Sequence, residues 1–119
     1  MNKVILLGRL GKDPEVRHTA SGVAVTSFTL ATSEKWRDKA GQTQEMTQWT
    51  NIVCWNKLAE TVGKYAHKGK QVLVEGKLTH RDYEDKTGAK RYITEVIADN
   101  VRFVGGTPND SADQGDSEL

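Results

Sequence analysis

The 119-residue chain is 36% apolar and 28% charged, and its formal net charge is +1. This length suits one domain with a modest core, and no apolar run approaches the roughly 20 residues of a membrane span, so we expect no membrane partner. The single cysteine, Cys54, excludes an internal disulfide and favours a reducing compartment, which predicts a cytoplasmic location.

The amino-terminal part of the chain predicts one strand followed by two turns. Residues 2–10 form a nearly continuous apolar run that ends before Gly11, and such a run is typical of a strand buried on both faces. Pro14 fixes the backbone of one turn, and the pair Ser21–Gly22 predicts another. We therefore expect the second strand to begin only after these turns.

Two further strands flank a polar hairpin tip. Residues 23–32 are rich in β-branched side chains and place Phe28 and Leu30 on one face. Residues 37–45 are polar and predict the tip, and residues 46–55 alternate again between apolar and polar side chains. These segments complete three predicted strands before the pattern changes.

The segment that follows has the period of a helix. Leu58, Val62 and Tyr65 have the i, i+4, i+7 spacing of one helical face. Asn56 is a candidate N-terminal cap, and Lys68–Gly69 is a candidate stop signal at the C-terminal end. The sequence therefore predicts one amphipathic helix directly after the third strand.

Two long strands complete the predicted domain. Residues 70–84 and 90–105 alternate with a period of two and flank the turn Asp85–Gly88. The order is three strands, one helix and two strands, which is the element order of a five-stranded OB-fold barrel. An SH3-like barrel has a similar strand count but usually lacks a long helix after the third strand. We predict an all-β OB-fold domain over residues 1–105.

The last residues of the chain differ in composition from this domain. Residues 106–119 hold four acidic side chains and no Lys or Arg, so twelve of the sixteen acidic residues and all seventeen basic ones lie in residues 1–105. The domain then has a net charge of +5. The final segment is rich in Gly, Pro, Ser and Asp and buries too little surface to offset its ordering entropy. We predict a disordered acidic tail.

No set of side chains predicts catalysis, a metal or a cofactor. Cys54 lies in an apolar strand, where burial raises a thiol pKa and limits access. His18, His67 and His80 lie on separate predicted elements and lack the spacing of metal ligands. No glycine-rich phosphate loop is present in the sequence. We therefore expect a binding protein and not an enzyme.

Four aromatic residues in polar or basic surroundings favour binding. Trp36 stands between two cationic residues at the mouth of a hairpin, which argues against burial. Trp49 and Trp55 share one strand face, and their spacing fits a core position as well as an exposed platform. The polar and charged neighbours of Tyr83 favour an exposed position for its ring. Unpaired bases stack on such rings while Lys or Arg contacts the phosphates. An oligosaccharide also stacks on tryptophan, but it does not call for the positive charge.

Four segments carry a resemblance to a known family: NKVILLGRLGKDPEVR (2–17), TLATSEKWRDK (29–39), KLAE (57–60) and RYITEV (91–96). Together they resemble the bacterial single-stranded-DNA-binding proteins of the homotetrameric OB-fold type, over residues 2 to about 104. The resemblance implies sequence-independent binding and protection of single-stranded DNA during replication, recombination and repair. It also implies a homotetramer and a nucleoid-associated location.

The resemblance also assigns a binding site. It implies base stacking by four aromatic residues, namely Trp36, Trp49, Trp55 and Tyr83. Trp55 stands where the best-known members have Phe, and Tyr83 where they have Trp, which weakens the platform there without abolishing it. The implied phosphate contacts are six basic residues, namely Lys3, Arg17, Arg37, Lys57, Lys68 and Arg81. Asp82 replaces a Lys of the family and subtracts positive charge.

The tail departs from the family pattern, and other classes of protein stay open. Family members usually end in an acidic tip with hydrophobic residues that replication and repair proteins bind, whereas this chain ends in GDSEL. A plasmid, phage or accessory member, or a shortened chain, would account for that ending. A dimeric primosomal relative is one alternative. An RNA-binding OB domain of the translation or cold-shock type is another, and clustered exposed Phe would be typical of it.

Overall fold

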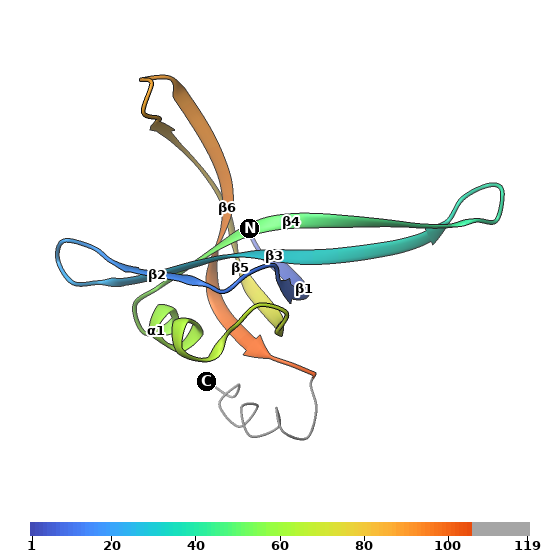
Figure 1. Cartoon of the computed structure of the whole chain (residues 1–119), viewed down its shortest axis with the longest axis horizontal. Helices are drawn as coiled ribbons and strands as arrows, with labels where there is room; N and C mark the ends of the chain where they lie inside the picture. Colours follow the sequence, from blue (N-terminus) through green and yellow to red (C-terminus); the bar gives the residue numbers. More distant parts are fainter. Residues whose placement is uncertain (106–119) are drawn as a thin grey trace.

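The computed structural model describes residues 1–105, and the predicted acidic tail lies outside the described residues. Figure 1 shows the arrangement of the described elements. In chain order these are β1 (Val4–Leu10), β2 (Glu15–His18), β3 (Ala24–Arg37), β4 (Thr43–Trp55), α1 (Asn56–Tyr65), β5 (Gln71–Glu84) and β6 (Lys90–Phe103).

Five of these strands close into a barrel. They pair in the order β1–β5–β6–β4–β3, and the pairs Arg9–Ala31 and Leu10–Leu30 join β1 to β3 and close the ring. β4 and β6 pair in parallel, while the other barrel neighbours are antiparallel. With α1 between the third and fourth barrel strands, this is the OB-fold that the sequence predicted.

β2 is an additional strand in a segment that was predicted to hold only turns. It pairs antiparallel with the first part of β3, from Glu15–Ser27 to His18–Ala24. The turn between them is closed by the Gly22 N–H, which donates to the Thr19 carbonyl oxygen at 2.9 Å. All four side chains of β2 are exposed, so no apolar alternation marks the strand in the sequence.

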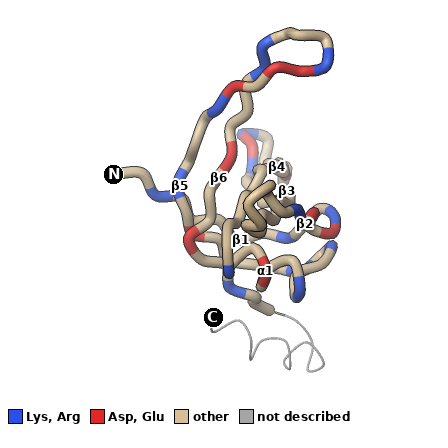
Figure 2. Tube along the Cα trace, turned by 90° about the vertical axis from the view of Figure 1, so that its left-hand side faces the viewer, with Lys and Arg blue, Asp and Glu red and all other residues tan. Residues whose placement is uncertain are grey.

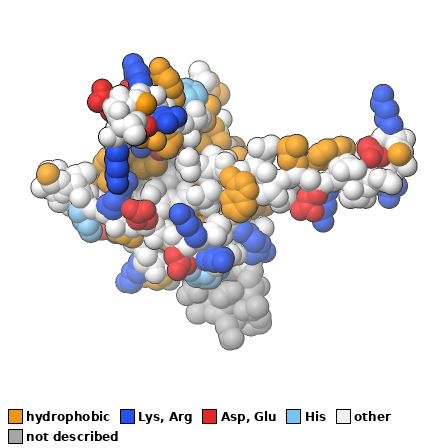
Figure 3. Space-filling view, turned by 45° about the horizontal axis from the view of Figure 1, so that its top comes forward, with side chains coloured by type: hydrophobic (Ala, Val, Ile, Leu, Met, Phe, Trp, Pro, Cys, Tyr) orange, Lys and Arg blue, Asp and Glu red, His pale blue; other side chains and the backbone are white. Residues whose placement is uncertain are grey.

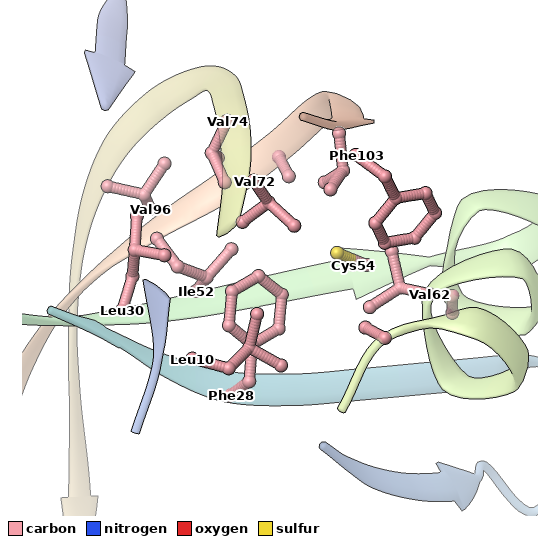
Figure 4. Close-up of a cluster of buried hydrophobic side chains, with 14 of the residues drawn as sticks. Leu10, Phe28, Leu30, Ile52, Cys54, Val62, Val72, Val74, Val96 and Phe103 are labelled. Atoms are coloured by element: carbon pink, nitrogen blue, oxygen red, sulfur yellow. The ribbon is translucent and has the colours of Figure 1, made fainter. Parts of the chain in front are cut away.

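The hydrophobic core fills the barrel, and α1 covers one end of it (Figures 1 and 4). Inward-facing side chains from the barrel strands include Leu30, Ile52 and Val74, and α1 adds Ala59 and Val62. The Thr26 hydroxyl donates to the Ala59 carbonyl oxygen at 2.6 Å and ties the helix to β3. These contacts fix the helix against the sheet, as its apolar spacing predicted.

The ends of α1 differ from the prediction. Asn56 supplies no side-chain cap, because it is the first residue of the helix and Trp55 occupies the cap position. Asn56 instead has a φ of 58°, a left-handed conformation that turns the chain from β4 into α1. The helix ends at Tyr65, where the Ala66 N–H donates to the Val62 carbonyl oxygen, so the predicted stop at Lys68–Gly69 lies in the turn beyond it.

β1 is buried on only one face, and the prediction of burial on both faces is wrong for the single chain. Val4 and Leu6 pack against the core, whereas Ile5 and Leu7 are 60% and 53% exposed. Their alternation follows from the period of two in a strand. The chain therefore leaves an apolar strip on the outer face of β1.

Two hairpins extend from the barrel as arms, one formed by β3 and β4 and the other by β5 and β6 (Figure 1). At the first tip, Asp38 Oδ1 accepts the N–H groups of Ala40 and Gln42, each at 2.9 Å. At the second tip, the Thr87 hydroxyl and N–H and the Arg91 guanidinium donate to Asp85 and lower its pKa to about 2. The side chains at both turns therefore hold the tips in a defined shape.

Candidate nucleic-acid interface

All four predicted stacking residues expose their rings. The exposed fractions are 45% for Trp36, 62% for Trp49, 42% for Trp55 and 47% for Tyr83. A core role for Trp49 and Trp55, which the sequence left open, is therefore excluded in the single chain. The space-filling view in Figure 3 shows hydrophobic side chains on the surface of the barrel and along the β3–β4 arm.

The strand register decides which rings share a face. Within β4, Ile52 and Cys54 point into the core, so Trp49 and Trp55 point outward from the same strand. Trp49 pairs with Ala31 and Trp55 with Val25 on β3. These two tryptophans therefore occupy the outer face of the barrel wall.

Trp36 lies on the other face of the β3–β4 ribbon. Trp36 pairs with Gln44. It lies five positions after Ala31, which is the partner of Trp49. Because side chains alternate along a strand, an odd separation places Trp36 and Ala31 on opposite faces. The structure therefore does not assemble the three tryptophans into one flat surface, and a strand that contacts all three must pass around the arm.

The Trp49 ring lies close to the backbone at Gly11. A Cβ built at Gly11 would lie 2.5 Å from Cζ3 of the Trp49 ring and 3.4 Å from both Cε3 and Cη2. No side chain larger than hydrogen fits there while the ring keeps its place. The absence of a side chain at Gly11 therefore allows the position of an exposed ring that lies far from it in the sequence.

An open groove of about 650 Å³ brings three predicted site residues together, namely Arg17, Trp55 and Arg81. β2, β3, β4, β5 and β6 all contribute to its wall. Val25, Val53 and Ile97 give it apolar surface. The remaining lining residues are polar or charged, namely His18, Thr19, Thr79 and Glu95. The groove thus offers an aromatic ring, apolar contact and two guanidinium groups within one hollow.

A second hollow of about 260 Å³ shares four lining residues with this groove, namely Arg17, Val53, Arg81 and Glu95. It also extends to Lys12, which the sequence did not single out as a site residue. Because the two hollows share these lining residues, they adjoin each other, and together they make up a depression on the outer face of β4. We call this depression the β4 groove.

Ion pairs compensate part of the positive charge in and around the β4 groove. Arg81 Nε lies 2.7 Å from Glu95 Oε1, and this contact raises the pKa of Arg81. Arg17 lies 3.8 Å from Glu15 in an exposed pair. Figure 2 shows Lys and Arg interspersed with Asp and Glu along the chain, most clearly on the β5–β6 hairpin. The groove is therefore not lined by a single sign of charge.

The other predicted contacts lie outside the groove. Lys3 precedes β1 and its ammonium lies 3.3 Å from Glu75, while Lys57 is the second residue of α1. Lys68 follows α1, and Arg37 ends β3 beside the tip of its arm. Tyr83 lies near the tip of the other arm and pairs with Arg91. These residues are spread over the molecule and do not form one site with the groove.

Lys12 and Glu95 are among the groove residues that sequence reasoning did not assign to the site. Glu95 had a usable signal, since it occurs at the same period as Ile93 and Ile97 on one face of the last strand. An acidic side chain in an otherwise apolar stripe predicts a buried charge with a partner. The identity of that partner depends on the β5–β6 register. The register pairs Arg81 with Ile93, which lies two residues before Glu95 on the same strand face, so Arg81 is a diagonal neighbour of Glu95.

Two kinds of reactive site can be assessed among the described residues, namely a reactive thiol and a metal centre. Cys54 is fully buried, and burial raises its pKa to about 12. Residues 1–105 contain no group of three or more His, Cys, Asp or Glu side chains placed to hold a metal ion. Within the same residues, no helix is long and apolar enough to cross a membrane.

The fold and the groove define a class of protein: an OB-fold whose outer face combines exposed aromatic rings with guanidinium groups. The model of the Single-strand binding protein family matches residues 1–104. The chain belongs to this family.

Three relatives show how far the similarity extends. Single-stranded DNA-binding protein 1 of Chlorobaculum tepidum is 50% identical over 106 residues, which cover 88% of this chain and 65% of that protein. A Plasmodium falciparum SSB solved in complex with ssDNA has a TM-score of 0.81 and 32% identity, covering 88% of this chain and 96% of that one. The single-stranded DNA binding protein from Thermus aquaticus, solved as a deletion variant, has a TM-score of 0.79 and 30% identity, covering 89% and 51%. The chain thus spans slightly less than two thirds of the Chlorobaculum protein.

Proposed function

We propose that the protein binds single-stranded DNA without sequence preference and protects it during replication, recombination and repair. The observation that carries this proposal is the outward pair Trp49 and Trp55, with Trp55 in a groove beside Arg17 and Arg81. Bases stack on such rings irrespective of sequence, since every base has a π-face, and the guanidinium groups contact phosphates. The relative from Plasmodium falciparum, solved in complex with ssDNA, supports the same ligand.

In this proposal the remaining predicted residues extend the DNA path beyond the β4 groove. Trp36 and Arg37 contact the strand on the β3–β4 arm, and Tyr83 contacts it on the β5–β6 arm. Lys3, Lys57 and Lys68 contact phosphates at the ends of the barrel. The protein acts by binding alone, without catalysis or a cofactor. Its location is the cytoplasm, in association with the nucleoid.

The binding unit in this proposal is a homotetramer. The exposed apolar strip of Ile5 and Leu7 supports self-association, because a second chain would remove it from water. In this proposal residues 1–105 are the assembling domain and residues 106–119 an acidic tail. Replication and repair proteins are candidate further partners of the protein. Sedimentation equilibrium at micromolar concentration should give four times the 13.2 kDa chain mass, whereas a monomer would contradict the assembly.

The DNA-binding proposal is tested by fluorescence anisotropy of labelled oligo-dT at several salt concentrations. Replacing Trp36, Trp49 or Trp55 by Ala should cost about 1–3 kcal/mol each, the range established for single-strand-binding proteins, with an unchanged salt slope. Replacing Arg37 or Lys57 by Ala should weaken binding and flatten the slope by roughly 0.7 for each phosphate that the variant no longer neutralises.

A matched aromatic control separates stacking from general surface effects. Tyr92 is 77% exposed and pairs with Asp82, so it points away from the face that carries Tyr83. Replacing Tyr92 by Ala should leave oligo-dT affinity unchanged. If Trp55→Ala lowers the melting temperature sharply and leaves affinity intact, Trp55 is structural and the platform is wrong. Equal affinity for a matched duplex would contradict the proposal, and preference for oligo-U would favour the RNA-binding alternative.

A further inference from the structure

Glu95 is the most deeply buried carboxylate of the β4 groove. Its side chain is only 6% exposed, although it lines both hollows of the groove. It projects from β6 between Asn51 of β4 and Thr79 of β5, its partners in the two strand registers. A buried charge is costly unless it is paired, so the identity of its partner decides what it does.

The partner of Glu95 is Arg81, and only the Nε of the Arg81 guanidinium takes part in the pair. Arg81 Nε donates to Glu95 Oε1 at 2.7 Å, which is the length of a charge-assisted bond. Arg81 is otherwise 56% exposed. Among the hydrogen bonds of residues 1–105, none involves the terminal nitrogens of Arg81. The guanidinium is therefore held by one edge, and the fork that binds phosphate in a bidentate manner is left for a ligand.

Two opposite effects of Glu95 on DNA binding follow from this arrangement. As a negative charge in the groove it repels phosphate and should weaken binding. As the anchor of Arg81 it removes rotamer freedom from a long side chain, which otherwise must be ordered when DNA binds. The burial of Glu95 against the Arg81 guanidinium favours the second effect, because a negative charge can repel phosphate equally well from an exposed position.

We propose that Glu95 is a positioning residue for single-stranded DNA: it holds Arg81 by Nε so that the terminal nitrogens face a phosphate in the β4 groove. This proposal rests on the proposed function. The Arg81–Glu95 pair stays intact in the complex, because a separated Glu95 would be a buried, unpaired charge. The anchoring effect exceeds the repulsion, so loss of the carboxylate weakens binding.

The test is a double-mutant cycle on oligo-dT affinity, with the salt slope measured for each variant. Arg81→Ala should weaken binding about tenfold and flatten the slope by roughly 0.7. Glu95→Ala should also weaken binding, by about three- to tenfold, although it removes a negative charge from the groove. In the Arg81→Ala background, Glu95→Ala should cause no further loss. Glu95→Gln retains an acceptor oxygen for Nε and should restore most of the affinity.

Asp82→Ala is the matched control for charge. It also removes one carboxylate and one ion pair, with Lys90 at 3.1 Å, but from the opposite face of the β5–β6 arm. It should leave affinity unchanged or slightly increased. If Glu95→Ala tightens binding as a charge effect would, or if its loss persists without Arg81, the positioning role is wrong. Failure of the unmodified protein to bind oligo-dT would instead overturn the proposed function itself.

A measurement on the unmodified protein covers the case in which Glu95→Ala fails to fold. The Arg81 Nε–H should give a distinct NMR resonance that is protected from solvent exchange by Glu95. On saturation with oligo-dT this resonance should keep its protection, while the terminal nitrogens become protected as well. Loss of the Nε–H protection on binding would show that DNA separates the pair, and it would overturn the proposal.

Discussion

The close approach of Trp49 to Gly11 allows one of the proposed stacking rings to be moved without changing the tryptophan itself. In Gly11→Ala, the added methyl group would lie 2.5 Å from Cζ3 of Trp49. Normal carbon–carbon contact requires roughly 3.5 Å, so the ring edge must retreat by about 1 Å. The ring is 62% exposed and has solvent to move into, which keeps the cost to folding small.

The size of the effect on DNA binding follows from that displacement. A gap of about 1 Å forfeits up to roughly half of a contact's dispersion energy. Full removal of the ring, in Trp49→Ala, should cost about 1–3 kcal/mol, which is the established range for this class of protein. Gly11→Ala should therefore cost about 0.5–1.5 kcal/mol toward oligo-dT, with an unchanged salt slope.

Anisotropy titration of four proteins decides the matter: the unmodified chain, Gly11→Ala, Trp49→Ala and the double variant. Since the methyl group acts only by moving the ring, the double variant should bind no more weakly than Trp49→Ala. The melting temperature of Gly11→Ala should stay within a few degrees of that of the unmodified protein. Replacing Gly by Ala lowers the conformational entropy of the unfolded chain, and this stabilising effect offsets the local strain in the folded state. If the affinity loss adds to that of Trp49→Ala, or if the melting temperature drops by a large amount, the methyl group does not act by displacing the ring.

Three further predictions concern other parts of the chain. The Cys54 thiol, whose pKa is raised to about 12 by burial, should resist thiol reagents at pH 8 in the folded protein and react on denaturation; rapid labelling of the native state would contradict its burial. Asn56→Gly should preserve stability and Asn56→Val should lower it by about 1–2 kcal/mol in urea unfolding, since Asn56 is left-handed; equal effects would exclude backbone strain. Deleting residues 106–119 should raise oligo-dT affinity at low salt and change little at high salt, because four tethered negative charges compete with phosphate; weaker binding at every salt concentration would place the tail in the site.

The sequence predicted the barrel because its strongest signals are local. The change of period at Leu58, Val62 and Tyr65 marks the helix, and the alternating segments on each side of it mark the barrel strands. β2 was missed because its exposed side chains carry no alternation. The burial of both faces predicted for β1 was wrong because an apolar run does not distinguish a face covered by the same chain from a face that the chain leaves exposed.

The site was predicted less completely, since it depends on pairing between distant strands. Polar neighbours correctly indicated that Trp36 is exposed, but only the β3–β4 register shows that it faces away from Trp49. The Arg81–Glu95 pair joins residues fourteen positions apart through the β5–β6 register. Local sequence therefore indicated which side chains are exposed and suited to binding DNA, while their arrangement in space required the tertiary structure.

The central claim is that unpaired bases stack on the exposed tryptophans, and the quenching of intrinsic tryptophan fluorescence by oligo-dT tests it most directly. The titration should be run at low and high salt against a duplex of matched length. Stacking predicts strong, saturable quenching by oligo-dT, with the same maximum at both salt concentrations and only a shifted midpoint. The duplex should quench weakly, because its paired bases hide their faces from the rings. Saturating oligo-dT that leaves tryptophan fluorescence unchanged, or a duplex that quenches it equally, would contradict the account.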